Sequence, residues 1–461
     1  MRAAVIQNKA IITIGVRLDS KFHLSDGIIT IREINKTHYS ITSLGQVSSD
    51  IYNGPRFKRI YVNDKAKGIP FMGSSDMLHS HFDSLKLISK KYSKNIDSLR
   101  IKKNWILVSC SGTIGNTVYT NENFEGKTAS QHIMRIIPDK NKIKEGFLYA
   151  YLSSKYGYSL LTQGTYGAVI QHIEPAHIEN IPVPIFPESK QLEIHNLIVE
   201  SANLRVEANR LLEEAKILLE KEINVHFQKE SFKIGSNNIK NIFSSLQCRL
   251  DPPALISNGV ETINKLKSKG VVFKALSECN TYVYRPGIFK RSYVEKGYPY
   301  IKGSELFDNN PFLRCQYLSK TKTPFVEQML LRENQILITC AGSCGQIKLI
   351  TKEFEDKGAI GSQDIIRVEA KDSLFTTEYL FIYFQLPFVF DYIQSMKYGS
   401  VIERIEPFHV ESIPVFMPSE EVSQEITDKI NTYKKDIYVA FNKENQAISF
   451  VEKEIESWQQ L

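Results

Sequence analysis

The sequence contains no long apolar run and few cysteines. Nowhere in its 461 residues is there the stretch of roughly 18 apolar residues that a membrane helix needs. Near the N-terminus, Gln7, Asn8 and Lys9 interrupt the apolar residues that a secretory signal would require. Six cysteines in a chain of this length do not form a disulfide scaffold. We therefore expect free thiols, as in a cytosolic protein.

Motifs for common enzyme chemistry are also missing. The chain has no GxxxxGK[ST] phosphate loop and no glycine-rich turn for a nucleotide cofactor. Asp251, Pro252 and Pro253 match the start of the motif of adenine amino-methyltransferases, but Ala254 replaces the aromatic residue that stacks the flipped base. We interpret this stretch as a turn.

Histidine and cysteine are too sparse for a metal or nucleophile site. Cys110 and Cys340 lie in apolar strand-like segments, where cysteine usually packs as a small side chain. Cys344 adds too few ligands for zinc. His177 and His409 each follow a Glu-Pro pair; they could be ligands or bases, but we expect them to hold a loop. The sequence thus predicts no catalytic, cofactor-binding or metal-binding residues, and a binding protein rather than an enzyme.

The chain is instead an internal duplication. YGAVIQHIEPAHIENIPV, which begins at residue 166, returns as YGSVIERIEPFHVESIPV from residue 398, with 12 of 18 positions identical. ILVSCSGTIG at 106–115 returns as ILITCAGSCG at 336–345, and SQHI at 130–133 as SQDI at 362–365. A repeat of about 232 residues is far longer than a solenoid unit. It indicates tandem domains.

Each copy predicts an α+β domain followed by a long helix. The ILVSCSGTIG stretch, with its glycine turn, predicts a β-hairpin, and residues 145–163 and 377–395 predict a buried aromatic helix. After Pro187 and Pro418 a heptad pattern follows, with a seam of Ser201, Ala208 and Ala215 in the first copy. We expect the two long helices to pair as an antiparallel coiled coil; a single helix lying on its own domain is the alternative. The positions expected on the helix pair are Leu197, Leu204, Leu211, Leu218, Ile426, Ile430, Ile437 and Val451.

The predicted order is domain, helix, domain, helix, with boundaries at 1–186, 187–230, 231–418 and 419–461. A formal net charge of +7 and a pI near 8.8 are compatible with a polyanionic partner.

Residues at glycine turns and at the variable repeat positions are the binding candidates. Backbone N–H groups around Gly112 can approach a phosphate. Gln171 and His172 correspond to Glu403 and Arg404 within an otherwise constant segment. Such divergence fits two domains that read different bases, although drift at the surface would look the same. The full set of candidates is Ser111, Gly112, Thr113, Gln171, His172, Lys302, Ser304, Ser343, Glu403, Arg404, Arg56 and Lys58.

The order and duplication of these segments resemble the specificity subunit of type I restriction–modification systems. The resemblance implies two target-recognition domains, each reading half of a bipartite, asymmetric double-stranded DNA site, and a helix pair that sets their spacing. It implies two modification subunits that carry S-adenosylmethionine and methylate adenine N6, and motor nuclease subunits that use ATP and Mg²⁺. It also implies a prokaryotic, cytoplasmic protein without a cofactor of its own. An N-terminal helical extension is not expected, because Arg17, Leu18 and Asp19 come so early.

Two alternatives remain open. One is a stand-alone DNA methyltransferase or restriction enzyme, which would bind S-adenosylmethionine by itself. The other is a scaffold, assembled through the heptad helices, that has no affinity for DNA.

Overall fold

The computed structural model describes residues 25–93, 95–163, 172–225, 227, 242, 249–370 and 373–458. The chain divides into two compact units. Unit 1 comprises Met1–Val206 with Val439–Leu461, and unit 2 comprises Glu207–Tyr438. Each unit therefore contains one copy of the repeat and part of each long helix. The boundaries at 187, 231 and 419 stay a prediction.

Within the described part of unit 1, the strands form two four-stranded sheets and a strand pair. The sheet orders are β2-β9-β6-β7 and β3-β5-β4-β8, and β1 pairs with β10. The strands are β1 Ile41–Ser43, β2 Ser48–Asn53, β3 Tyr61–Val62, β4 Gly68–Met72, β5 Lys86–Ser89, β6 Ile106–Ser109, β7 Thr117–Tyr119, β8 Thr128–Ala129, β9 Ile133–Pro138 and β10 Pro182–Pro184.

Unit 2 repeats this topology strand for strand over its described residues. Its sheets run β12-β19-β16-β17 and β13-β15-β14-β18, and β11 pairs with β20. The strands are β11 Phe273–Ala275, β12 Tyr282–Tyr284, β13 Tyr293–Val294, β14 Tyr298–Ile301, β15 Gln316–Leu318, β16 Ile336–Thr339, β17 Ile347–Leu349, β18 Ile360–Gly361, β19 Ile365–Glu369 and β20 Pro414–Phe416.

The predicted hairpin forms in both units. In unit 1, β6 pairs antiparallel with β7, with Ile106 opposite Tyr119. In unit 2, β16 pairs with β17 in the same way. All four residues of β6 and of β16 are buried, because each strand lies inside its sheet, between two neighbours, and carries an apolar, β-branched sequence.

Among the described residues, five short helices of unit 1 have counterparts in unit 2, which contains two more. Unit 1 contains α3 Asp26–Ile34, α4 Ile96–Leu99, α5 Glu145–Ser153, α6 Lys155–Gln163 and α7 Pro175–Ile178. Unit 2 contains α10 Pro252–Ile256, α11 Asn258–Ser268, α12 Val326–Met329, α13 Lys352–Asp356, α14 Thr377–Gln385, α15 Pro387–Ser395 and α16 Pro407–Glu411, of which α10 and α13 are the two additional helices. Four 3₁₀ turns complete the description: Asp76–Leu78, Glu122–Phe124, Leu276–Glu278 and Glu305–Phe307.

The expected single aromatic helix is two helices in each unit. Leu386 is extended, with ψ 136°, because the ring of Pro387 disfavours a helical residue before it. In unit 1, Ser154 takes the same extended conformation and its hydroxyl oxygen accepts a hydrogen bond from Gly157 N at 3.2 Å. A hydrogen bond accepted by the Ser154 hydroxyl therefore accompanies the helix break in unit 1, whereas a proline breaks the helix in unit 2.

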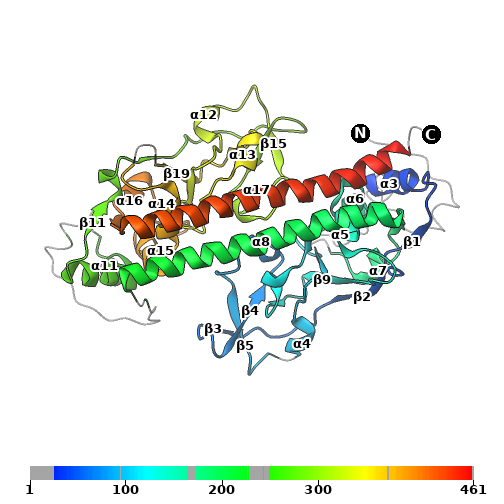
Figure 1. The fold of residues 1–461 in the computed structure, drawn as a ribbon, viewed down its shortest axis with the longest axis horizontal. Helices are drawn as coiled ribbons and strands as arrows, with labels where there is room; N and C mark the ends of the chain where they lie inside the picture. The colour runs from blue at the N-terminus through cyan, green and yellow to red at the C-terminus, as the bar shows by residue number, and fades with distance from the viewer. Residues whose placement is uncertain are drawn as a thin grey trace. The chain divides into compact units, whose positions relative to one another are not determined.

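The long helices α8 (Glu188–Ile223) and α17 (Glu420–Ser457) pair antiparallel (Figure 1). In unit 1, Lys190 contacts Glu454 at 2.6 Å, and the Ser201 hydroxyl donates to Ala440 O at 2.7 Å. In unit 2, Glu214 contacts Lys429 at 3.1 Å, and Glu222 accepts from Ser419 N at 3.0 Å. Partner numbers fall along α17 as they rise along α8, which defines the antiparallel direction.

Small residues lie in the seam of α8, as the heptads predict. Ser201, Ala208 and Ala215 are at most 1% exposed. On α17, Ile426, Ile430 and Val451 are fully buried, and Ile437 is half-buried.

The leucine series of α8 lies beside the seam rather than on it. Leu197, Leu204 and Leu218 are half-buried, whereas Ile198, Leu212 and Leu219 are buried. Leu211 is 8% exposed. The buried face of α8 is therefore centred about one residue away from the predicted leucine positions. The reason is that α8 packs both against α17 and against the core of the unit in which each of its halves lies. In unit 2, Leu212, Leu219, Ile426 and Ile430 share one hydrophobic core with α14 and α15.

A buried polar cluster interrupts the heptad seam in unit 1. Arg205 contacts Glu444 at 2.6 Å, and the Tyr149 hydroxyl donates to the same carboxylate. Glu444 is 3% exposed. The positions 232 residues away in unit 2 are Ile437, Leu212 and Phe381, all in or against the apolar core.

Among the described helices, none is long and apolar enough to cross a membrane.

Candidate nucleic-acid interface

Three segments of unit 1 meet at the end of β6. Cys110 N donates to His132 O at 3.0 Å, and Ile173 N donates to Cys110 O at 3.1 Å. Ser111 forms an isolated β-bridge with His172. These bonds bring together the turn after β6, the loop between β8 and β9, and the segment before α7.

Unit 2 builds the same frame from the corresponding residues. Cys340 N donates to Asp364 O at 3.1 Å, and Ile405 N donates to Cys340 O at 3.1 Å. Ala341 forms a β-bridge with Arg404. The main chain of this three-segment junction is thus the same in both units, and only its side chains differ.

A buried arginine supports the junction in unit 1. Arg135 is 0% exposed and donates from both terminal nitrogens to four carbonyl oxygens at 2.6–3.1 Å. The acceptors belong to Leu99, Ala129, Ser130 and Ile133. Burial lowers the pKa of its guanidinium to about 10, so the group is charged at neutral pH. Its hydrogen bonds hold the loop that carries Gln131 and His132.

Arg367 supports the junction of unit 2 in the same way. It is 0% exposed and donates to the carbonyls of Met329, Gly361, Ser362 and Ile365 at 2.8–3.4 Å. Burial lowers its pKa to about 10 as well. Both arginines follow the SQxI segment by the same spacing.

The glycine turn after β6 is open to solvent. Gly112 has φ +76° and Gly342 has φ +71°, a region that other residues rarely adopt, and a Cβ on either would meet nothing within 4 Å. Gly112 and Thr113 are exposed, as are Gly342 and Ser343. Both turns therefore lie at the surface, and in unit 2 the Gly342 N–H donates to Glu403 O at 3.3 Å.

Beside the turn, unit 1 carries a chain of hydrogen-bonded side chains. Arg59 Nη2 donates to Gln131 Oε1 at 2.9 Å, and Gln131 Nε2 lies 2.9 Å from His132 Nε2. His132 Nδ1 lies 2.6 Å from the hydroxyl of Ser111. Burial, followed by the nearby charges of Arg59, His172 and Arg56, lowers the pKa of His132, so its ring is neutral at neutral pH.

Unit 2 places charged groups at the same location. Arg291 Nη2 lies 3.7 Å from Asp364 Oδ2, and Gln363 Oε1 accepts from Phe289 N at 3.3 Å. Glu403, beside Arg404, is paired with Lys397.

The segment before α16 forms a short loop closed by two hydrogen bonds. Tyr398 N donates to Arg404 O at 3.0 Å, and Arg404 N donates to Tyr398 O at 2.8 Å. At its tip, Val401 is 93% exposed and Ile402 is 53% exposed. The corresponding first-copy residues, including the candidate Gln171, lie outside the described residues.

The other predicted candidates lie near the junction or on the segment after β2. Arg56 and Lys58 are exposed there, close to Arg59 in sequence. Lys302 is paired with Glu305 at 3.2 Å. Ser304 is exposed, and a Cβ on the intervening Gly303 would lie 3.8 Å from Thr339 Cγ2, at the end of β16.

Sequence reasoning missed the loop between β8 and β9. Neither Gln131 and His132 nor Gln363 and Asp364 were candidates for binding. The signal was present, because SQHI and SQDI differ at one position inside a constant segment. Like the pairs Gln171/Glu403 and His172/Arg404, the pair His132/Asp364 fits two domains that read different bases.

The matched cysteines and histidines are structural. Cys110 is 3% exposed, and burial raises the pKa of its thiol to about 11. Burial likewise raises that of Cys340 to about 12, so both thiols stay protonated. His177 Nδ1 accepts from Glu174 N at 3.0 Å, and His409 Nδ1 accepts from Glu406 N at 2.9 Å. Each histidine caps a short helix, as the loop-holding interpretation expects.

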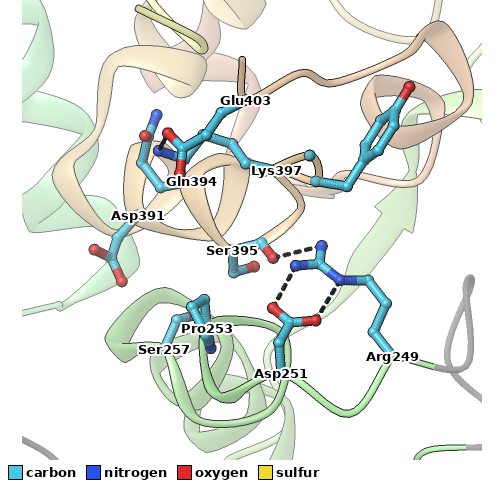
Figure 2. A pocket seen from close by; sticks show the side chains of 11 residues that line it. Arg249, Asp251, Pro253, Ser257, Asp391, Gln394, Ser395, Lys397 and Glu403 are labelled. Carbon is cyan, nitrogen blue, oxygen red and sulfur yellow. Dashed lines mark hydrogen bonds and ion pairs between the residues drawn. The ribbon is translucent and has the colours of Figure 1, made fainter. Parts of the chain in front are cut away.

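The Asp-Pro-Pro stretch begins a helix rather than forming a turn. Asp251 precedes α10 as its N-cap, and Pro252 and Pro253 occupy the first helical positions, where proline is favoured because no N–H is needed there. Figure 2 shows the carboxylate of Asp251 held by Arg249, whose Nε lies 2.6 Å from Oδ1.

Arg249, Asp251 and Pro253 help to line a pocket of about 590 Å³ in unit 2. Its charged groups are already paired: Arg249 with Asp251, Lys397 with Glu403, and Asp391 with Gly259 N at 2.9 Å. Within the described part of the chain, no cluster of three or more His, Cys, Asp or Glu could hold a metal ion.

The comparisons with known proteins agree with the duplication. A family model described as the type I restriction modification DNA specificity domain matches residues 35–200 and again residues 274–448. No curated protein matches the sequence.

Solved structures of the same kind match across most of the chain. The S subunit of a type I restriction–modification system from M. genitalium is 14% identical, with 90% of this chain and 96% of that chain covered and a TM-score of 0.36. The HsdS subunit from Thermoanaerobacter tengcongensis is 12% identical, with the same coverage and a TM-score of 0.29. Because these TM-scores lie below 0.5, the family assignment depends on the family model alone.

Proposed function

Because the chain belongs to the type I restriction–modification DNA specificity family, we propose that each of its units reads one half of a bipartite, asymmetric double-stranded DNA site. The chain is a specificity subunit and not itself an enzyme. The alternatives of a stand-alone methyltransferase and a DNA-independent scaffold have no support from any described site.

The observation that carries this proposal is the three-segment junction. Two units with one main-chain frame carry different side chains, namely the buried Ser111 with His132 and His172 in unit 1 and Ala341, Asp364 and Arg404 in unit 2. Hydrogen bonds to base edges carry sequence information, whereas contacts to phosphates position the protein. A constant frame with variable side chains is what two readers of different half-sites require.

Phosphate contacts come from groups beside the junction. Arg56 and Lys58 are exposed and, with Arg59, form a basic segment in unit 1. The open turn at Gly112 adds main-chain N–H groups, whereas the N–H of Gly342 already donates to Glu403 O at 3.3 Å. In this assignment the basic segment and the turn contact the phosphates of the DNA backbone, and the junction contacts the bases.

Catalysis belongs to partner subunits in this proposal. Two modification subunits, carrying S-adenosylmethionine, dock on the specificity subunit and methylate adenine N6. Motor nuclease subunits, using ATP and Mg²⁺, cleave DNA that lacks the mark. The exposed faces of α8 and α17 are the surface that we assign to the modification subunits.

The test is an exchange of one domain. Residues 1–186 are replaced by the corresponding domain of another family member, and the methylated adenines are mapped in cells that contain the assembled complex. We expect one half-site to change and the other to stay, because each unit folds around its own junction. Replacing residues 231–418 instead should change only the second half-site.

Two results would contradict the proposal. One is a change in both half-sites after a single exchange, and the other is an unchanged site. In vitro, binding of the complex to its site should weaken steeply as salt rises, because counterions are released from each neutralised phosphate.

A further inference from the structure

We infer that the loop position occupied by His132 in unit 1 and Asp364 in unit 2 selects the chemistry of one base in each half-site. Unit 1 reads a base edge that accepts hydrogen bonds, and unit 2 reads a base edge that donates them. The inference rests on the proposed function, and it identifies residues and base chemistry within that function.

The two positions are equivalent in the main chain. His132 and Asp364 are 232 residues apart, as are Arg59 and Arg291, and Arg135 and Arg367. The carbonyl of each position accepts from the cysteine that follows the inner strand, at 3.0 and 3.1 Å. The amide of each donates to the preceding serine hydroxyl, at 3.3 and 3.2 Å. Only the side chain differs.

An arginine stacked on an aromatic ring lies beside the position in both units. Arg59 lies over Phe71, 5.0 Å from the ring centroid. Arg291 lies over Tyr300 at 5.6 Å, and its Nε donates to the Tyr300 hydroxyl at 2.7 Å. Stacking holds each guanidinium in a fixed plane, which suits it to planar recognition. The neighbour of the arginine then decides what the site presents.

In unit 1 that neighbour is a neutral amide. Because Arg59 donates to Gln131 Oε1, the amide nitrogen of Gln131 faces His132 and donates to its Nε2. The remaining ring proton lies on Nδ1 and is donated to Ser111 Oγ. Arg59 is half-buried, and among the described residues no ion pair joins it to a carboxylate, so its charge is not offset there.

In unit 2 the neighbour is a carboxylate. Asp364 lies 3.7 Å from Arg291, and the two side chains are 40% and 34% exposed. The carboxylate offsets the charge of the guanidinium and still has oxygens open to solvent. At this place, where unit 1 presents donors, unit 2 presents an acceptor.

The base chemistry follows from the groups displayed in the DNA grooves. Guanine presents two acceptors, O6 and N7, in the major groove, and arginine is the side chain that most often binds them. Cytosine N4 and adenine N6 present amino donors, and a carboxylate accepts from them. The junction of unit 1 therefore fits a guanine, and that of unit 2 fits the amino group of cytosine or adenine.

The experiment exchanges the two side chains in the full-length chain. His132→Asp and Asp364→His are each assembled with the modification subunits of the same system, in cells without other adenine methylation, and methylated sites are mapped. We expect each variant to change the preference at one base pair, in its own half-site, by about tenfold or more. The other half-site should be unchanged.

Two further variants separate base reading from folding and from general affinity. Asp364→Asn keeps the shape of the side chain and removes its charge, so it should relax the preference at the same base pair. Lys58→Ala removes an exposed cation and should lower methylation of all sites alike, without changing any preference. Each variant should unfold at the wild-type denaturant concentration.

The outcomes are distinct. The inference would be overturned if His132→Asp and Asp364→His kept the wild-type base preference. It would also be overturned if either variant changed the half-site that the other unit reads. If Asp364→His methylates nothing, a wild-type preference in Asp364→Asn overturns it as well. A failed domain exchange would instead refute the proposed function.

Discussion

At the three-segment junction, units 1 and 2 differ in the side chains that face solvent and agree in the groups that satisfy buried carbonyls. Arg135 and Arg367 are both fully buried and bind the same kinds of carbonyl. His132 and Asp364, a few residues before them, differ in charge and in hydrogen-bonding capacity. Leaving a buried carbonyl without a donor costs stability, whereas a half-exposed side chain finds water instead. The duplication has therefore kept the supports of the junction and changed what the junction displays.

The helix seam shows a second difference, inside the protein. Unit 1 contains the Tyr149–Arg205–Glu444 cluster where unit 2 is apolar. A buried ion pair is weak evidence for stability, because removing two charges from water offsets most of their attraction. The two halves therefore reach similar packing by different chemistry.

The largest effect is expected from removing a buried arginine. Arg135→Met removes the hydrogen bonds to four carbonyls, of which that of Ser130 also accepts from Ile133 N, and should lower the free energy of unfolding of unit 1 by about 4–5 kcal/mol. The chain has two tryptophans, Trp105 and Trp458, both in unit 1, so tryptophan fluorescence during denaturant titration reports on this unit. Arg367→Met should leave the fluorescence transition in place and move the transition of unit 2 in circular dichroism.

Arg32→Met is the matched control, because Arg32 is exposed on α3 and should cost less than about 0.5 kcal/mol. A loss below about 1 kcal/mol in Arg135→Met would mean that water replaces the guanidinium and that the arginine does not hold the loop.

A somewhat smaller effect is expected in the helix seam. Glu444→Leu removes the carboxylate that Arg205 contacts at 2.6 Å and should cost about 3 kcal/mol. Copying the set of unit 2, with Tyr149→Phe, Arg205→Ile and Glu444→Leu together, should restore stability to within about 1 kcal/mol of wild type. Fluorescence unfolding of unit 1 measures both. Equal losses in the single and triple variants would show that the apolar set of unit 2 does not fit unit 1.

The smallest effect concerns the cap of α16. His409→Ala removes the acceptor for Glu406 N and should cost about 1 kcal/mol near pH 7.5. Burial lowers the pKa of His409 in the folded state, so the unfolded state takes up a proton first as pH falls. The stability that neutral His409 gives is thus complete above about pH 6.5 and is lost below it.

Thermal unfolding of unit 2, followed by circular dichroism from about pH 7.5 to about pH 5.5, checks this expectation. The difference between wild type and His409→Ala should shrink as pH falls. His177→Ala removes the same kind of cap from an exposed side chain and serves as the control for the lost hydrogen bond. A difference that grows with acid would contradict the assignment of His409 as a buried neutral cap.

Much of the fold could be predicted, because it depends on local patterns repeated twice. The hairpin of β6 and β7 follows from a β-branched run on either side of a glycine turn. The pairing of α8 with α17 follows from heptads with small residues at 201, 208 and 215. The break at Ser154 could not be predicted, since a serine interrupts a helix only when its side chain captures a main-chain group.

The candidate site was predicted only in part. Ser111 was recognised from the glycine turn and His172 from the repeat, and they form a β-bridge. His132 was overlooked because its importance depends on Arg59 and Gln131, which come from other segments. Spacing along the chain does not reveal which segments meet.

The sequence by itself determined the duplication, the strand–helix order of each copy and the two long helices, because periodicity and turn residues act over short distances. Only the tertiary structure decided which face of α8 is buried, which arginines lie beneath the junction and which side chains it displays. Those features arise from hydrogen bonds and packing between residues that are far apart in the chain. The strength of these interactions depends on burial, which local sequence patterns do not predict.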